Sequence, residues 1–249
     1  MNHLPVRTPT VPPATHTNCY RVGRVVVDPA SPWDDEQDRL ATWADGVDTI
    51  LLTHHHVDHV GGVEDLRRRT GAKVYAHADS RLDFVLDGTL ADGDEIDTGA
   101  GTLTALHTPG HADGHLCFRH DTGAILAGDM VAGIGTIVLI EPEGHLATYL
   151  ASLERLRALG GRLYPAHGPD LDGVAATSQY LAHRNARSEQ VAASLRDRPL
   201  DPREIAAVVY AGVPGVDLAL AAVQVRTHLR WLVERGRARH HADGSFTRE

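Results

Sequence analysis

Histidine and aspartate side chains gather in one short segment of the sequence, which reads Thr53-His54-His55-His56-Val57-Asp58-His59. Imidazole nitrogens and carboxylate oxygens are ligands that zinc accepts in catalytic sites. Residues two apart in an extended chain project to the same side, so His54 and His56 can hold one metal ion together. Asp58 and His59 lie where the chain turns into a helix, and they can therefore face a second ion a few ångströms away.

His111, Asp129 and His167 occur in a similar setting, because each follows a short run of apolar or β-branched residues. Ligands at the ends of neighbouring strands meet at one edge of a sheet. A lone His-x-His motif in a chain with 17 histidines would most simply be a solvated loop. Candidate ligands that recur just beyond predicted strands instead indicate a metal site built from several parts of the chain.

These segments resemble, in the same order, the motifs of the metallo-β-lactamase superfamily over roughly residues 18 to 175. The resemblance implies an α/β fold, a four-layer αββα sandwich with the metals at one end of two facing sheets. It also implies that His54, His56 and His111 hold one ion, that Asp58, His59 and His167 hold a second, and that Asp129 bridges them. We expect two divalent ions, with zinc preferred over iron or manganese.

Other polar residues near this set are expected to support it rather than to bind metal. His55 should face away from the ions. His115, four residues after His111, and Asp28, at the end of a predicted strand, should orient the ligands or the loop that carries them. Asp58 could also orient an attacking hydroxide.

Short apolar runs alternate with helical patterns through the first 180 residues, as in an α/β domain. The predicted strands are Arg24 to Val27, Thr49 to Leu52, Lys73 to Ala76, Thr102 to Leu106, Leu116 to Arg119, Ala124 to Ala127, Thr136 to Ile140 and Arg162 to Tyr164. The predicted helices are Asp34 to Trp43, Val63 to Thr70 and Tyr149 to Leu159. We expect a catalytic domain over residues 1–180.

Beyond residue 180 the pattern changes to three helices and a short terminal hairpin. Asp201-Pro202-Arg203-Glu204 is typical of a helix start, with Asp as the N-cap and Pro at the first helical position. Leu218 to Arg235 predicts a longer amphipathic helix, and Asp243-Gly244 suits a tight turn between two strands. Three helices followed by a hairpin is the element order of a winged helix. We therefore expect a winged-helix domain over residues 181–249, similar to that of the superfamily's β-lactamase-like branch.

The composition is that of an ordinary soluble globular protein. Hydrophobic residues make up 42% of the chain, and no apolar run approaches the ~20 residues of a membrane span. Residues 1–17 lack the apolar core of a secretory signal, so we expect a cytoplasmic protein. Cys19 and Cys117 are far apart and form no C-x-x-C motif, which argues against a cysteine-rich zinc site. The net charge of −9 argues mildly against a general nucleic-acid binder, although the residues from Arg184 onward carry a net +3.

Two metal ions roughly 3.5 to 4 Å apart make a metal-bound hydroxide available at neutral pH and polarise the bond under attack. We expect hydrolysis of an ester, a thioester or a similar small acyl substrate, because the catalytic region is acidic and has no long insertion to bind RNA. The main alternative is a single-strand endoribonuclease or other phosphodiesterase, with nucleic acid bound by the C-terminal domain. Two further functions stay open. One is a persulfide dioxygenase with a single iron, and the other is a non-catalytic winged-helix DNA binder. No membrane partner is expected, and the oligomeric state is undetermined by the sequence.

Overall fold

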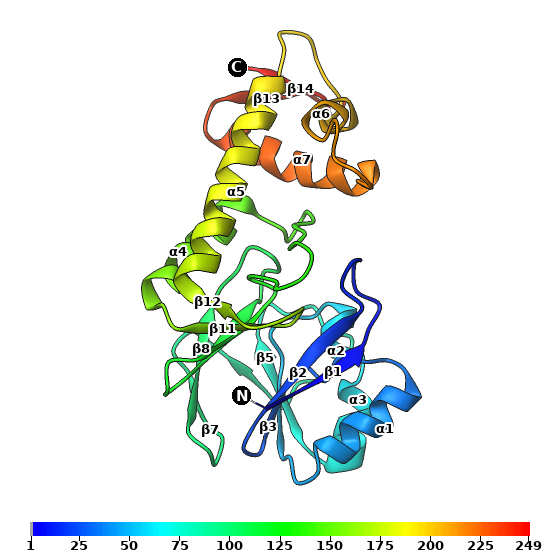
Figure 1. Ribbon diagram of the computed structural model, residues 1–249, viewed down its shortest axis with the longest axis vertical. Coiled ribbons are helices and arrows are strands. Elements are labelled where there is room, and N and C mark those ends of the chain that lie inside the picture. The colour runs from blue at the N-terminus through cyan, green and yellow to red at the C-terminus, as the bar shows by residue number, and fades with distance from the viewer. Residues whose placement is uncertain (1) are drawn as a thin grey trace.

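The computed structural model describes residues 2–249 and contains two six-stranded sheets that face each other (Figure 1). The first sheet has the order β1-β2-β3-β4-β5-β6, with bounds β1 Asn2–Arg7, β2 His16–Val22, β3 Val25–Val27, β4 Thr49–Leu51, β5 Lys73–His77 and β6 Gly88–Leu90. The second has the order β12-β11-β10-β9-β8-β7, with bounds β7 Glu95–Asp97, β8 Thr102–His107, β9 Leu116–His120, β10 Ile125–Gly128, β11 Arg162–Pro165 and β12 Leu171–Asp172. Strands β3 to β6 are parallel, as are β10 and β11, and the other pairs are antiparallel, so both sheets are mixed.

Apolar side chains form a core between the sheets and another on each outer face. Phe118 is fully buried among residues from the inner faces of both sheets. The outer face of the first sheet is covered by α1 (Asp34–Trp43) and α3 (Val63–Thr70). The outer face of the second sheet is covered by α4 (Leu146–Leu159) and α5 (Gly173–Ser194). The layers therefore run helix, sheet, sheet, helix.

Helices α1 and α3 have the bounds that the sequence predicts. α3 ends before Gly71, whose φ of 72° lies in the left-handed region that glycine adopts without strain. α4 begins at Leu146, about one turn before the expected start at Tyr149. α2 (Val57–Val60) is a single turn that carries Asp58 and His59. No helix within residues 2–249 is long and apolar enough to cross a bilayer.

The prediction of a strand over Thr136 to Ile140 is wrong, because these residues form an irregular loop. Peptide groups of Ile137 and Leu139 bond to side chains of the C-terminal helices rather than to a neighbouring strand. Conversely, none of the strands predicted from the sequence covers β1 or β2. β1 contains Pro5, which an edge strand tolerates because it lacks a partner on one side.

The C-terminal region consists of the end of α5 followed by α6 (Pro202–Val209), α7 (Leu218–Glu234) and a hairpin of β13 (Ala238–His240) and β14 (Phe246–Arg248). α6 begins with the expected cap, in which Asp201 and Glu204 form a reciprocal capping box. Leu200 pairs with Phe246, so the segment before α6 adds to the hairpin. α5 runs from the sandwich into this region, and residue 180, where we expected a domain boundary, lies inside that helix (Figure 1).

Candidate metal centre

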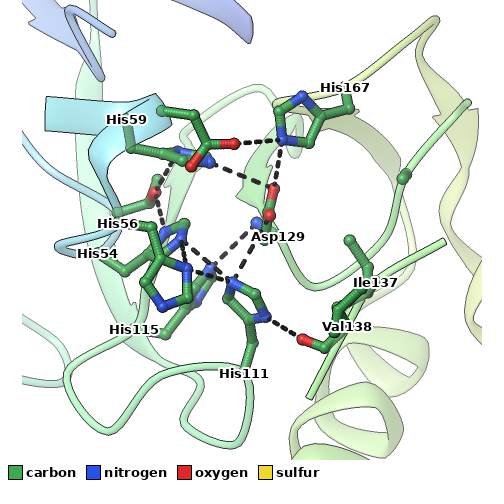
Figure 2. A network of polar contacts seen from close by, with 12 residues as sticks. His54, His56, His59, His111, His115, Asp129, Ile137, Val138 and His167 are labelled. Atoms are coloured by element: carbon green, nitrogen blue, oxygen red, sulfur yellow. Dashed lines mark hydrogen bonds and ion pairs between the residues drawn. The ribbon is translucent and has the colours of Figure 1, made fainter. Parts of the chain in front are cut away.

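The side chains that the sequence analysis singled out meet at one edge of the sandwich (Figure 2). They lie on the loop after β4, on α2 and just beyond β8, β10 and β11, and they are His54, His56, Asp58, His59, His111, Asp129 and His167. The ends of strands from both sheets therefore supply the candidate ligands.

His54, His56 and His111 form the first group of candidate ligands. His54 Nε2 lies 3.0 Å from His56 Nδ1 and 3.2 Å from His111 Nε2, and the latter two nitrogens are 3.0 Å apart. Nitrogens that bind one tetrahedral zinc at about 2.0 Å are separated by about 3.3 Å. The three nitrogens therefore form a triangle of the size that a single ion requires.

Asp58, His59 and His167 form the second group, and Asp129 lies between the two groups. Asp129 Oδ1 is 3.5 Å from His59 Nε2 and 3.4 Å from His167 Nε2. Its Oδ2 is instead 3.6 Å from His111 Nε2. Asp58 Oδ2 lies 3.6 Å from His167 Nε2. Each oxygen of Asp129 faces a different group, as a bridging carboxylate would.

Two buried polar atoms at the centre, His59 Nε2 and Asp129 Oδ1, have no hydrogen-bond partner among the described residues. A polar atom left unpaired in a protein interior costs about 1–3 kcal/mol. The two atoms are 3.5 Å apart. A cation bound by both would satisfy them, so the residues present fit a metal ion at the second group.

All five histidines of the two groups use their other ring nitrogen to contact an oxygen atom. These oxygens, at 2.8 to 3.2 Å, are Thr53 Oγ1 for His54, Glu143 Oε1 for His56, Asp28 Oδ2 for His59, the Val138 carbonyl for His111 and the His16 carbonyl for His167. Such hydrogen bonds fix the tautomer and the direction of a metal-binding imidazole. Each ring is therefore held with its second nitrogen toward the site.

Burial and charge set the protonation of these groups. Burial, together with the neighbouring histidines, lowers the pKa of His54 well below its usual value, and burial lowers the pKa of His111 to about 4. Both rings are neutral at pH 7 and present a lone pair. Burial also opposes charge on His59 and Asp129, but the Asp129 carboxylate raises the pKa of His59, and His167 and His59 hold the pKa of Asp129 well below its usual range. The buried carboxylate needs a positive partner, and a metal ion can take that place.

His115 and Asp28 contact the candidate ligands without joining either group. His115 Nδ1 lies 2.9 Å from Thr108 Oγ1, and its Nε2 accepts a hydrogen bond from the backbone N–H of Asp129 at 3.1 Å. Asp28 accepts hydrogen bonds from the backbone N–H and the hydroxyl of Thr53 and from His59. His115 thus holds Asp129 in place, and Asp28 holds Thr53 at the start of the loop that follows β4.

Glu143 is a functional candidate that the sequence analysis missed. It lies in the loop before α4, with Oε1 3.2 Å from His56 Nε2 and Oε2 3.0 Å from His55 Nε2. An acidic residue in an irregular loop, far from its partners in the chain, gives no spacing signal that would reveal this contact. His55 therefore faces Glu143 rather than either group of candidate ligands.

A cavity of about 110 Å³ opens beside His56, Asp58, His111, Asp129 and His167. The rest of its lining is mostly aliphatic and includes Val11, Ile134, Val138 and Ile140. Of the described residues that line it, none is lysine or arginine. Apart from the five candidate ligands and the threonines Thr10 and Thr136, the described lining is therefore apolar.

Comparison with known proteins identifies relatives along most of the chain. The sequence pattern of the metallo-beta-lactamase superfamily matches residues 12–168. The chain is 30% identical over 256 residues to a beta-lactamase-like protein 2 homolog of Drosophila melanogaster, with 90% of this chain and 84% of that protein covered. It is 34% identical over 206 residues to an atrochrysone carboxyl ACP thioesterase of Cryptosporiopsis sp., with 76% and 61% covered. The crystal structure of a metallo-beta-lactamase family protein from Thermus thermophilus matches with a TM-score of 0.85 at 24% identity, with 100% and 98% covered.

Proposed function

The chain belongs to the metallo-beta-lactamase superfamily, and we propose that it is a hydrolase with two metal ions that cleaves the thioester or ester bond of a small acyl substrate. Imidazole and carboxylate ligands suit zinc, which we propose as the metal. The proposed ligands are His54, His56 and His111 for one ion and Asp58, His59 and His167 for the other, with Asp129 between them.

The apolar wall of the cavity is the observation that carries this proposal. Val11, Ile134 and Ile140 expose 48%, 43% and 52% of their surfaces at or near the cavity, and such side chains suit the hydrocarbon part of an acyl group. A nucleic-acid backbone is instead bound mainly by lysine and arginine, which are missing from the described lining. The relative from Cryptosporiopsis is named as an ACP thioesterase, which agrees with an acyl substrate.

When bound, divalent ions lower the pKa of a water molecule and polarise the bond under attack. The chain's own residues position the reactants. Asp58 lines the cavity, and we propose that its carboxylate orients the attacking water by accepting a hydrogen bond from it. Val11 and Ile134 would hold the acyl chain and keep bulk water away from it.

The C-terminal region is proposed to be a winged-helix domain that packs on the catalytic region rather than a nucleic-acid module. The order of α5, α6, α7 and the hairpin supports the winged helix, as does the pairing of Leu200 with Phe246. Arg237, just before the hairpin, forms an ion pair with Glu189 of α5, so the charge of this arginine is already compensated. The proposed partner of the protein is therefore a small molecule.

A substrate panel combined with metal analysis of the full chain tests the proposal. We expect elemental analysis to find about two zinc ions per chain after reconstitution. Acyl thioesters and activated esters should turn over, whereas an activated phosphodiester should not. Removal of the metal by a chelator should abolish turnover, and added zinc should restore it.

Other results would favour the competing functions. Cleavage of phosphodiesters without cleavage of thioesters would contradict the acyl assignment and favour an endoribonuclease. A single iron per chain together with oxygen consumption on a persulfide would favour a dioxygenase. Protein that retains no metal and turns over none of the substrates would overturn the hydrolase altogether.

A further inference from the structure

Residues 137–139 form a buried segment between the candidate metal centre and the C-terminal helices. The Val138 carbonyl accepts a hydrogen bond from His111 Nδ1 at 2.9 Å. Figure 2 shows this bond on the side of the His111 ring that faces away from the other candidate ligands. The position of one backbone carbonyl therefore sets the direction in which His111 Nε2 points.

The same peptide group is held from its other side by a residue of α7. Leu139 N–H donates a hydrogen bond to Gln224 Oε1 at 3.2 Å. This N–H and the Val138 carbonyl belong to one peptide unit, which is planar, so fixing the N–H also fixes the carbonyl. Gln224 is thereby connected to His111 through a single rigid group, and hydrogen bonds in such a chain polarise one another.

Further bonds hold Gln224 and the segment in place. Gln224 Nε2 donates to the Leu139 carbonyl at 2.9 Å, and Thr227 Oγ1 donates to the same carbonyl at 3.0 Å. Arg184 of α5 donates to the Ile137 carbonyl at 2.5 Å and lies 3.4 Å from Gln224 Oε1. Gln224, Thr227 and Arg184 are all buried. Helices α5 and α7 thus supply the partners that a neighbouring strand would supply in a sheet.

We propose that Gln224 is a positioning residue of the metal centre, which fixes the peptide between Val138 and Leu139 and, through it, the ring of His111. The inference rests on the proposed function, since it takes His111 as a metal ligand. It gives the C-terminal region a role in the catalytic site that requires no nucleic acid. Loss of a residue that supports a metal ligand lowers metal affinity about 10–100-fold. Gln224 acts one peptide further away, so we expect about a tenfold loss.

The test compares Gln224→Met with Gln190→Met in the full chain. Methionine keeps the size of glutamine but cannot make its hydrogen bonds. Gln190 is the matched control, because it is exposed on α5 and its side chain makes no hydrogen bond within the described residues. Zinc dissociation constants are measured by competition with a chelator. Gln224→Met should weaken one of the two sites about tenfold and leave the other nearly unchanged, and Gln190→Met should alter neither.

Two further readouts separate positioning from general stability. The visible spectrum of the cobalt-substituted protein reports the geometry of the ligands, and it should shift in Gln224→Met but not in Gln190→Met. Thermal unfolding of the metal-free variants measures the structural cost alone. Thr227→Val removes one hydrogen bond to Leu139 and is measured in parallel. Thr227→Val should weaken zinc binding at the same site by about threefold. If Gln224→Met does not fold, the zinc affinity of Thr227→Val tests the positioning role instead.

Unchanged zinc affinity at both sites in folded Gln224→Met would overturn the inference, as would equal losses at both sites. The proposed function fails differently. Wild-type protein that binds no zinc would contradict the hydrolase, and the inference would fail with it. Wild-type protein that binds two zinc ions and cleaves thioesters, beside a variant with unaltered affinity and spectrum, would contradict the positioning role alone.

Discussion

His55 and His56 are neighbours in the chain and both contact Glu143, but their second ring nitrogens have different surroundings. His56 Nδ1 lies 3.0 Å from nitrogens of both His54 and His111. His55 Nδ1 is buried and has no hydrogen-bond partner among the described residues. Successive side chains of an extended segment point in opposite directions, which explains the difference.

Alanine variants of His111 and His55 should therefore behave differently. His111→Ala removes a nitrogen from the first group and should abolish turnover and reduce bound zinc to about one ion per chain. The variant should stay folded, because the apolar cores on both faces of the sheets are separate from this ring. His55→Ala should retain both ions and most of the activity. Elemental analysis, circular dichroism and thioester turnover measure these outcomes, and identical behaviour of the two variants would refute the assignment.

The identity and spacing of the candidate ligands could be predicted from the sequence, but most of their partners could not. Histidine and aspartate just beyond predicted strands indicate metal ligands by their residue types and positions, and both are evident in the sequence alone. The oxygens that orient His111 and His167 are backbone carbonyls, which any residue type would provide. Glu143 is a side chain, but the irregular loop that brings it to His56 has no periodicity. Support of this kind depends on tertiary packing alone.

The same limit applies to the elements. α1 and α3 were predicted with their bounds because the acidic first turns of both helices, and the glycine that follows α3, act within a few residues. The β-branched run Thr136 to Ile140 predicts extended backbone equally well, but a strand also needs a partner. Here the partner groups come from Gln224 and Thr227, nearly 90 residues later. The local pattern could not distinguish a strand from a loop held by a helix.

His228 on α7 makes the packing of α7 against α5 sensitive to pH. The ring is buried, and its Nδ1 lies 2.8 Å from Ser188 Oγ. Burial, with the positive charges of Arg184, Arg187 and His183, lowers the pKa of His228 from 6.5 to about 3. At pH values between about 3 and 6.5, His228 therefore binds a proton in the unfolded chain but not in the folded protein. The contribution of His228 to stability is therefore complete above pH 6.5 and is lost as the pH falls toward 3.

Replacing His228 by glutamine should make the free energy of unfolding less sensitive to acid. One proton corresponds to about 1.4 kcal/mol per pH unit, so the wild type should lose about 2 kcal/mol more than His228→Gln between pH 7 and pH 5. Urea unfolding of the metal-free proteins at the two pH values measures this difference and excludes effects of metal release. If both proteins lost the same stability, His228 would be protonated in the folded state.

Charge is distributed unevenly over the whole molecule. The net charge is −9, although the residues from Arg184 onward carry a net +3. Some of these arginines face acidic partners, since Arg230 lies 3.3 Å from Glu141, which precedes this region, and Arg239 lies 2.9 Å from Glu249 within it. Exposed ion pairs contribute little to stability, but they reduce the positive potential that a phosphate backbone would meet. The hairpin also lies at the end of the molecule remote from the sandwich (Figure 1).

We therefore expect single-stranded RNA to bind weakly and acyl hydrolysis to depend little on salt. Arg226 and Arg230 are exposed one turn apart on α7 and share one face of that helix, where Arg230 also contacts Glu141. Fluorescence anisotropy with labelled RNA across a salt series is the measurement, with the Arg226→Ala, Arg230→Ala double variant as the comparison. If these side chains bound a backbone, affinity would fall log-linearly with salt, with a slope that scales with the number of phosphates neutralised. We expect weak binding because the acidic catalytic region should repel RNA from the candidate metal centre. Tight binding that weakens with salt and is lost in the double variant would instead make the nuclease the leading function.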